Sequence, residues 1–238
     1  MDYYEQTALK ELNKWKKKMR RKPTMAEQTS KGIQNKLNDI LPEKYHELVT
    51  EAIKNMTKLV LFGSKYITKT PYMHMGLHER ELLVSQLTKR YRTTALIEGA
   101  GTGAGGILLG LADLPLLMSI KIKMLYDIAA AYGYDVYDYR ERIYILSIFQ
   151  LAFSSKSRTN EVYAKMENFQ VYLTTLPEDI NSFDWRTFQL EYRDYIDLAK
   201  LLQMIPGFGA VVGAYVNTKL INKLSHTAMQ AYRMRFFN

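Results

Sequence analysis

Three groups of residues in this 238-residue chain have types and spacings that could do chemistry. The glycines of Gly101–Gly106 fit the pattern G-x-G-x-x-G, in which backbone N–H groups approach the phosphates of a dinucleotide. His74 and His78 are four residues apart, a spacing that lets two imidazoles share a metal ion on one helix. The third group is a set of acids that could act as general acid or base in a hydrolytic cleft, and it comprises Asp113, Asp127, Asp135, Asp138 and Glu141.

Each chemical interpretation lacks a necessary partner. A dinucleotide fold needs alternating strands and helices and an acid about twenty residues after the glycines, and Asp113 comes too early. No third metal ligand accompanies the two histidines, and a chain without cysteine has no thiolate nucleophile. Asp138 and Asp113 both stand where an N-cap is expected, so capping explains these acids without a ligand. We therefore expect no cofactor and no metal.

The elements that must position these residues are helices, because almost every periodic segment repeats its apolar residues every three or four positions. Gly133 is expected at the left-handed C-cap of one of them. The predicted helices are Tyr3–Arg21, Thr24–Leu41, Pro42–Lys69, His78–Ala95, Leu114–Tyr132, Asp138–Ser154, Glu161–Thr175, Asp184–Met204 and a last helix ending at Phe237. The fold class is therefore all-α, a single multi-helix domain.

The stretch EGAGTGAGGILLGLADLPLL, Glu98–Leu117, is richer in glycine than a helix tolerates without a reason. Each helical glycine costs about 1 kcal/mol relative to alanine, and glycines four apart let another backbone approach closely. The spacing therefore predicts two glycine-rich helices packed closely in the core. Their packing glycines would be Gly99, Gly101, Gly103, Gly105, Gly106, Gly110, Gly209 and Gly213. Each glycine segment is followed by a helix that carries lysine and ends near an Ala-Tyr pair, at Tyr132 and at Tyr232, which suggests a weak internal duplication.

The glycine-rich stretch is too short and too interrupted to favour a membrane span. A spanning helix needs roughly 20 mostly apolar residues, and Asp113 would lie inside it. A buried hairpin is the better interpretation, and a hairpin that inserts into lipid is an alternative.

The charge of the chain is concentrated at its N-terminal side. Residues 1–92 contain 19 Lys and Arg against 10 Asp and Glu, which accounts for the whole formal net charge of +9. Residues 1–23 are predicted to form a basic amphipathic arm, followed by a helical domain over residues 24–238. The arm's candidate membrane-binding residues are Lys14, Trp15, Lys16, Lys17, Lys18, Met19, Arg20, Arg21 and Lys22.

Two interpretations of the arm remain open. Such a helix can lie in the headgroup plane of an anionic leaflet with Trp15 and Met19 inserted below it. Alternatively, the apolar stripe packs on the protein's own core and the lysines face water; this stripe consists of Leu9, Leu12, Trp15 and Met19. Nucleic acid is a disfavoured partner, because no nucleic-acid-binding module accompanies the basic residues.

The chain resembles the EcsC family over roughly residues 75–237. The resemblance rests on the glycine-rich segment, Asp113-Leu114-Pro115, Tyr132-Gly133-Tyr134-Asp135, and the glycines after Pro206 that lead to Asn217 and Arg233. The family takes its name from a protein encoded beside the ATPase and membrane subunits of an ABC exporter. The resemblance implies membrane association and a link to transport or secretion; it implies no catalytic residues.

The sequence thus leads to a non-catalytic adaptor or regulator beside an ABC transporter. It would be cytoplasmic, peripheral to the inner face of the membrane, with the anionic membrane surface and transporter subunits as partners. The alternative from another class is a hydrolase of lipid or peptide with a carboxylate-based site. The sequence names no substrate and no oligomeric state.

Overall fold

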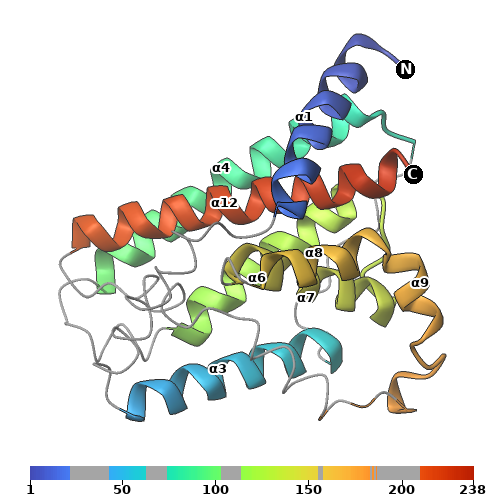
Figure 1. Cartoon of the computed structure of the whole chain (residues 1–238). Coiled ribbons are helices and arrows are strands. Elements are labelled where there is room, and N and C mark those ends of the chain that lie inside the picture. Colours follow the sequence, from blue (N-terminus) through green and yellow to red (C-terminus); the bar gives the residue numbers. More distant parts are fainter. Residues whose placement is uncertain are drawn as a thin grey trace.

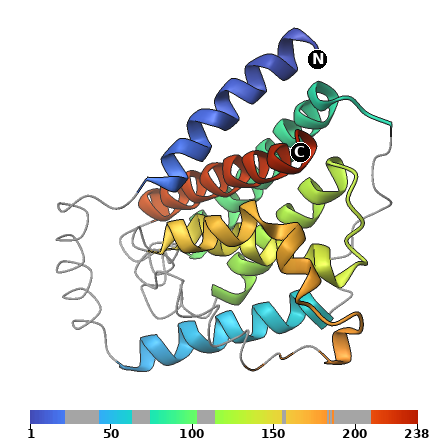
Figure 2. The same cartoon turned by 45° about the vertical axis from the view of Figure 1, so that its right-hand side comes forward.

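Two long helices, α4 (Leu77–Thr102) and α12 (Ala210–Phe236), lie side by side in the computed structural model (Figures 1 and 2). They are antiparallel, because the hydroxyls of Thr88 and Ser225 are 2.6 Å apart while Glu81 pairs with Arg233 further along. The remaining helices pack around this pair.

The structure describes residues 1–21, 43–62, 74–102, 114–154, 158–182, 184, 186 and 210–238. Within these ranges, every element of regular secondary structure is a helix, as the periodicity predicts. The fold is therefore all-α. Besides α4 and α12, the α-helices are α1 (Tyr3–Arg20), α3 (Glu43–Phe62), α6 (Leu114–Ala131), α7 (Tyr139–Phe153), α8 (Thr159–Glu167) and α9 (Phe169–Thr174). A short 3-10 helix, η2, covers Ile180–Ser182.

The helices form successive layers. Helix α1 lies on the outer side of α12 and α4 and also contacts α8. Helices α6 and α7 pack against the other side of the pair, and α3 lies beneath them, on the far side from α1. The core lies between these layers and is formed by the buried faces of α6, α7 and α12 together with parts of α1, α3, α4 and α8.

Helix ends are fixed by local hydrogen bonds of short polar side chains. Asp2 and Glu5 form a reciprocal capping box at the start of α1, with the Glu5 N–H donating to Asp2 Oδ1 at 2.7 Å. Asp138 accepts from the N–H of Arg140 and caps α7, as the sequence predicts. The glutamate oxygen of Glu79 accepts from the N–H of Gly76 before α4.

A buried tyrosine and an arginine connect α3 to the neighbouring helices α6 and α7. The Tyr126 hydroxyl donates to the carbonyl of Val60 at 2.9 Å, and Arg142 donates to that of Leu61 at 2.8 Å, so the end of α3 is held to α6 and α7. The last carbonyls of a helix have no partner within the helix. These two bonds therefore satisfy carbonyls at the end of α3 and also fix its position.

The predicted helix Glu161–Thr175 is wrong as a single helix. The structure divides it at Asn168, whose side-chain amide and backbone N–H both donate to the carbonyl of Ala164, at 3.1 and 3.2 Å. A short amide side chain competes in this way with the backbone N–H for the helical carbonyl, and the chain changes direction. The result is a corner between α8 and α9.

The glycine-rich prediction is only partly within the described residues. Helix α4 runs through Gly99 and Gly101, and Gly213 lies in α12. Gly103, Gly105, Gly106, Gly110 and Gly209 lie outside the described residues, so the close packing of these glycines stays a prediction. Across the ranges that the structure does describe, no helix is long and apolar enough to span a bilayer.

The C-terminus of α6 ends in a Schellman motif. The N–H of Gly133 donates to the Ala130 carbonyl at 2.9 Å and that of Tyr134 to the Ala129 carbonyl at 3.0 Å, with Gly133 at φ 86°. This confirms the predicted C-cap. The motif turns the chain so that Tyr132 and Tyr134 both face α12.

Replacing Gly133 with alanine is expected to lower the free energy of unfolding by about 1 kcal/mol, because a Cβ is strained at positive φ. Asparagine, which tolerates this conformation, is expected to cost less. Urea denaturation monitored by circular dichroism measures both; equal losses for alanine and asparagine would contradict the assignment.

Candidate functional site

Two arginines in the last turn of α12 each pair with a carboxylate near the start of another helix. Arg233 reaches Glu81 of α4, with its Nη2 2.6 Å from Oε2 and its Nε 2.6 Å from Oε1. This bidentate pair is buried, with side-chain exposures of 5% and 1%. Arg235 reaches Glu141 of α7, with Nη1 2.6 Å from Oε2. Parallel donation by a planar guanidinium makes the first pair strongly directional.

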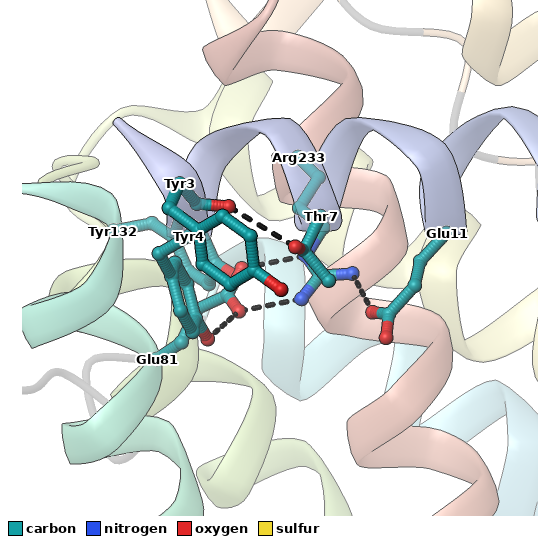
Figure 3. Close-up of polar contacts among 7 residues, drawn as sticks. All are labelled: Tyr3, Tyr4, Thr7, Glu11, Glu81, Tyr132 and Arg233. Carbon is teal, nitrogen blue, oxygen red and sulfur yellow. Dashed lines mark hydrogen bonds and ion pairs between the residues drawn. The ribbon is translucent and has the colours of Figure 1, made fainter. Parts of the chain in front are cut away.

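The first pair is the centre of a network of four helices. The hydroxyls of Tyr4 and Tyr132 donate to the two oxygens of Glu81, at 2.6 and 2.9 Å. Arg233 Nη1 donates to Glu11 of α1 at 2.7 Å. Figure 3 shows both tyrosines beside Glu81 and Glu11 on the opposite side of Arg233. Because Glu81 accepts four hydrogen bonds, its buried charge is fully compensated.

The second pair lies in an aromatic environment. Tyr232 donates to Glu141 Oε1 at 2.7 Å. The guanidinium carbon of Arg235 lies 3.6 Å from the ring centre of Tyr134 and 4.6 Å from that of Tyr144. Such stacking compensates a partly desolvated cation.

Burial and charge shift the pKa values of this network. Burial and the hydrogen bond to Glu81 raise the pKa of Tyr4 to about 12, so its hydroxyl remains a donor at neutral pH. Burial raises the pKa of the Glu141 carboxyl, and the charge of Arg235 opposes this. Burial alone would lower the pKa of Arg233, yet hydrogen bonds to Glu81 and Glu11 raise it above its ordinary value.

The structure brings together two of the residues that carry the family resemblance, Tyr132 and Arg233, which meet through Glu81. It does not bring Asp135 to them. Asp135 is exposed and accepts from the N–H of Tyr137 at 2.8 Å, which stabilises the turn before α7. Asp113 lies outside the described residues, and Pro115 and Asn217 lie in α6 and α12 with undescribed side chains.

The two candidate metal ligands do not share a helix, in agreement with the predicted helix that begins at His78. His74 lies in the bend before α4 at φ 66°, while His78 is in the first turn and its ring is 4.4 Å from that of Tyr4. Among the described residues, no three histidine, aspartate or glutamate side chains gather where they could hold a metal.

The basic arm is docked on the protein. Leu12 and Trp15 are buried, and the Trp15 ring meets that of Tyr163 edge-on at 5.5 Å. Met19 is partly buried against the core. Arg20 forms a two-point ion pair with Glu167 of α8, and Asn160 donates to the carbonyls of Arg20 and Arg21. In this structure, the apolar stripe packs on the protein's own helices, as the second interpretation of the arm has it.

The cations of the arm lie around this docked stripe. Lys14, Lys17, Lys18 and Arg21 are exposed, and Lys16 is half-buried. Lys22 lies outside the described residues.

The sequence interpretation missed Glu81 as the central residue of the network. The signal was present, because Glu81 shares a helix face with Leu77, Val84 and Tyr91, which are all buried. An acid in the apolar stripe of a helix indicates a buried partner. Its partners Tyr4, Glu11 and Arg233 come from distant parts of the chain, so no local pattern identifies them.

Replacing Arg233 with methionine is expected to lower the free energy of unfolding by about 3–5 kcal/mol, because Glu81 is left charged and buried. The double variant Glu81→Leu/Arg233→Met removes both charges and is expected to recover a large part of this loss. Chemical denaturation of both single variants and the double variant gives the coupling energy. Additive losses would show that the pair is not coupled.

Known proteins resemble this chain over almost its whole length. The model of the EcsC protein family matches residues 6–237. Protein EcsC from Bacillus subtilis (strain 168) is 43% identical over 231 residues, which cover 97% of this chain and 95% of that protein. A second B. subtilis relative, named Uncharacterized protein YdbA, is 26% identical over 248 residues and covers 95% and 90% of the two chains. No solved structure matches. This chain therefore belongs to the EcsC protein family.

Proposed function

We propose that this protein is a non-catalytic adaptor that binds the anionic inner face of the cell membrane beside ABC transporter subunits. The transporter link comes from the family resemblance. The membrane contact is supported by one observation in particular, the exposed lysines of α1 on a helix that is itself firmly docked.

A docked α1 changes the expected mode of membrane contact. Leu12 and Trp15 are buried against the body of the protein, so contact in this conformation would be electrostatic. Each lysine near an anionic leaflet contributes about 1 kcal/mol, and the attraction falls off within a Debye length. Binding of this kind is reversible and sensitive to salt, which suits a peripheral adaptor.

In the described part of the chain, the buried acids do not supply the carboxylate-based site of the alternative hydrolase. Glu81 and Glu141 are both engaged by arginine and tyrosine. Asp127 accepts from Tyr91 and Lys123, at 2.5 Å each. These contacts account for the burial of each acid as part of helix packing, and the structural role fits an adaptor.

A pair of charge-reversal variants tests the membrane contact. Lys14 and Lys18 are exposed and four residues apart on α1; Lys54 and Lys58 are exposed and four apart on α3, on the far side of the protein. Changing either pair to glutamate lowers the formal net charge by the same amount. Only the α1 variant is expected to lose affinity for anionic vesicles, by about 2 kcal/mol or roughly thirtyfold from the two lost lysines, and further through repulsion of the new carboxylates.

Flotation with phosphatidylglycerol-containing and pure phosphatidylcholine vesicles, at low and high salt, measures the effect. The wild-type protein and the Lys54→Glu/Lys58→Glu control should float with anionic vesicles at low salt and be released at high salt. Equal losses in the two variants would point to net charge alone, and unaffected binding in the α1 variant would overturn the proposed surface.

A further inference from the structure

A cavity of about 460 Å³ opens between the α8–α9 corner, the turn after α6 and the end of α12. Its volume lies within the range of small-molecule sites. The residues of its wall that matter for recognition are Tyr134, Met166, Glu167, Phe169, Val171 and Arg235. The corner at Asn168, which the helical periodicity did not predict, is what creates this hollow.

Arg235 gives the cavity a preorganised cation. Its Nη1 is bonded to Glu141, and the rings of Tyr134 and Tyr144 hold the guanidinium in place. A guanidinium carries further N–H donors on Nε and Nη2, and 18% of the side chain is exposed at the cavity wall. A fixed planar fork of this kind suits a phosphate or carboxylate.

The cavity wall also includes apolar side chains, beside the polar Asn168, Gln170 and Asn238. Met166 and Phe169 are buried, whereas Val171 is 67% exposed although it is an aliphatic residue on α9. Methylene groups that cover the exposed Val171 side chain would remove hydrated apolar surface from water, which favours binding. The cavity therefore combines a cationic end with an apolar side.

The negative charge of Glu167 in the wall is already compensated. Both of its oxygens accept from Arg20, at 2.5 and 3.1 Å, and Tyr163 donates to Oε1 at 2.7 Å. Arg20 is the last residue of α1, so the cationic end of the arm lies beside the cavity. Of the two charged side chains in the wall, Glu167 is paired with Arg20, and Arg235 carries further N–H donors that suit an anionic group.

We propose that this cavity binds a monomeric anionic amphiphile of the glycerophospholipid type. Arg235 would hold the phosphate, and Met166, Phe169 and Val171 would contact the first methylenes of the acyl chains. This site is separate from the lysine surface of α1 and does not require that surface to bind vesicles.

The test uses the full chain labelled at its methionine methyls with ¹³C. Met166 and Met234 line the cavity, while Met118 is buried on α6 and serves as an internal reference. Titration with dihexanoylphosphatidylglycerol below its critical micelle concentration is expected to shift the first two resonances saturably and to leave Met118 unmoved. Glycerol 3-phosphate and dihexanoylphosphatidylcholine are the comparison ligands and should bind more weakly.

Val171→Asp places a negative charge on the apolar wall without disturbing a buried group, and it is expected to weaken binding roughly tenfold or more. Leu82→Asp on α4, where the leucine is 52% exposed, is the matched control and should bind as the wild-type protein does. Arg235→Lys keeps the charge beside Glu141 but loses the planar fork, and it should also weaken binding.

Several results would overturn the proposal. These are no saturable shift with the phosphatidylglycerol probe, equal affinity for glycerol 3-phosphate, or equal affinity of the Val171→Asp and Leu82→Asp variants. The second result would show a free-phosphate site instead of an amphiphile site. The Lys14→Glu/Lys18→Glu variant should still bind the monomer, so failure of the vesicle experiment and failure of this one are distinguishable.

Discussion

The structure depends on the buried ion pair between Glu81 and Arg233. Four hydrogen bonds end on one carboxylate, and the donors come from α1, α6 and α12 while the acid belongs to α4. Burying a charge is costly unless every oxygen is satisfied, so these helices can pack only in the arrangement that brings all the donors to Glu81. The apolar core supplies most of the driving force for burial, and this network selects one register among many apolar packings.

A second buried acid has the same kinds of partner, one tyrosine and one arginine. Glu141 near the start of α7 accepts from Tyr232 and Arg235, as Glu81 near the start of α4 accepts from Tyr132 and Arg233. The rings of Tyr132 and Tyr232 stack with their centres 5.1 Å apart. Tyr132 directly follows α6, whereas Tyr232 lies within α12, the helix that also contains Gly213. The correspondence fits the internal duplication suggested by the two Ala-Tyr sequences, with both arginines contributed by α12.

The arm and the body of the protein are linked through the same helices. Helix α1 is bound to α12 through Glu11, to α4 through Tyr4 and to α8 through Arg20. Its lysines are therefore held on a rigid scaffold, and its last residue lies beside Glu167 in the wall of the cavity. A partner that pulled α1 away would break contacts with three helices.

The sequence by itself determined the helical class, most of the helix positions, the caps at Asp138 and Gly133, and the amphipathic character of α1. These are local properties, because periodicity and capping act within a few residues along the chain. The tertiary structure decided which interpretation of the arm's apolar stripe holds in this conformation, because Trp15 meets Tyr163 only after folding. It also decided which side chains pair with the buried acids, and it placed the corner between α8 and α9 at Asn168. Glu81 was visible as an acid on an apolar face, but its partners are 77, 51 and 152 residues away in the chain. No local signal specifies pairings over such separations, since they follow from the packing of whole helices.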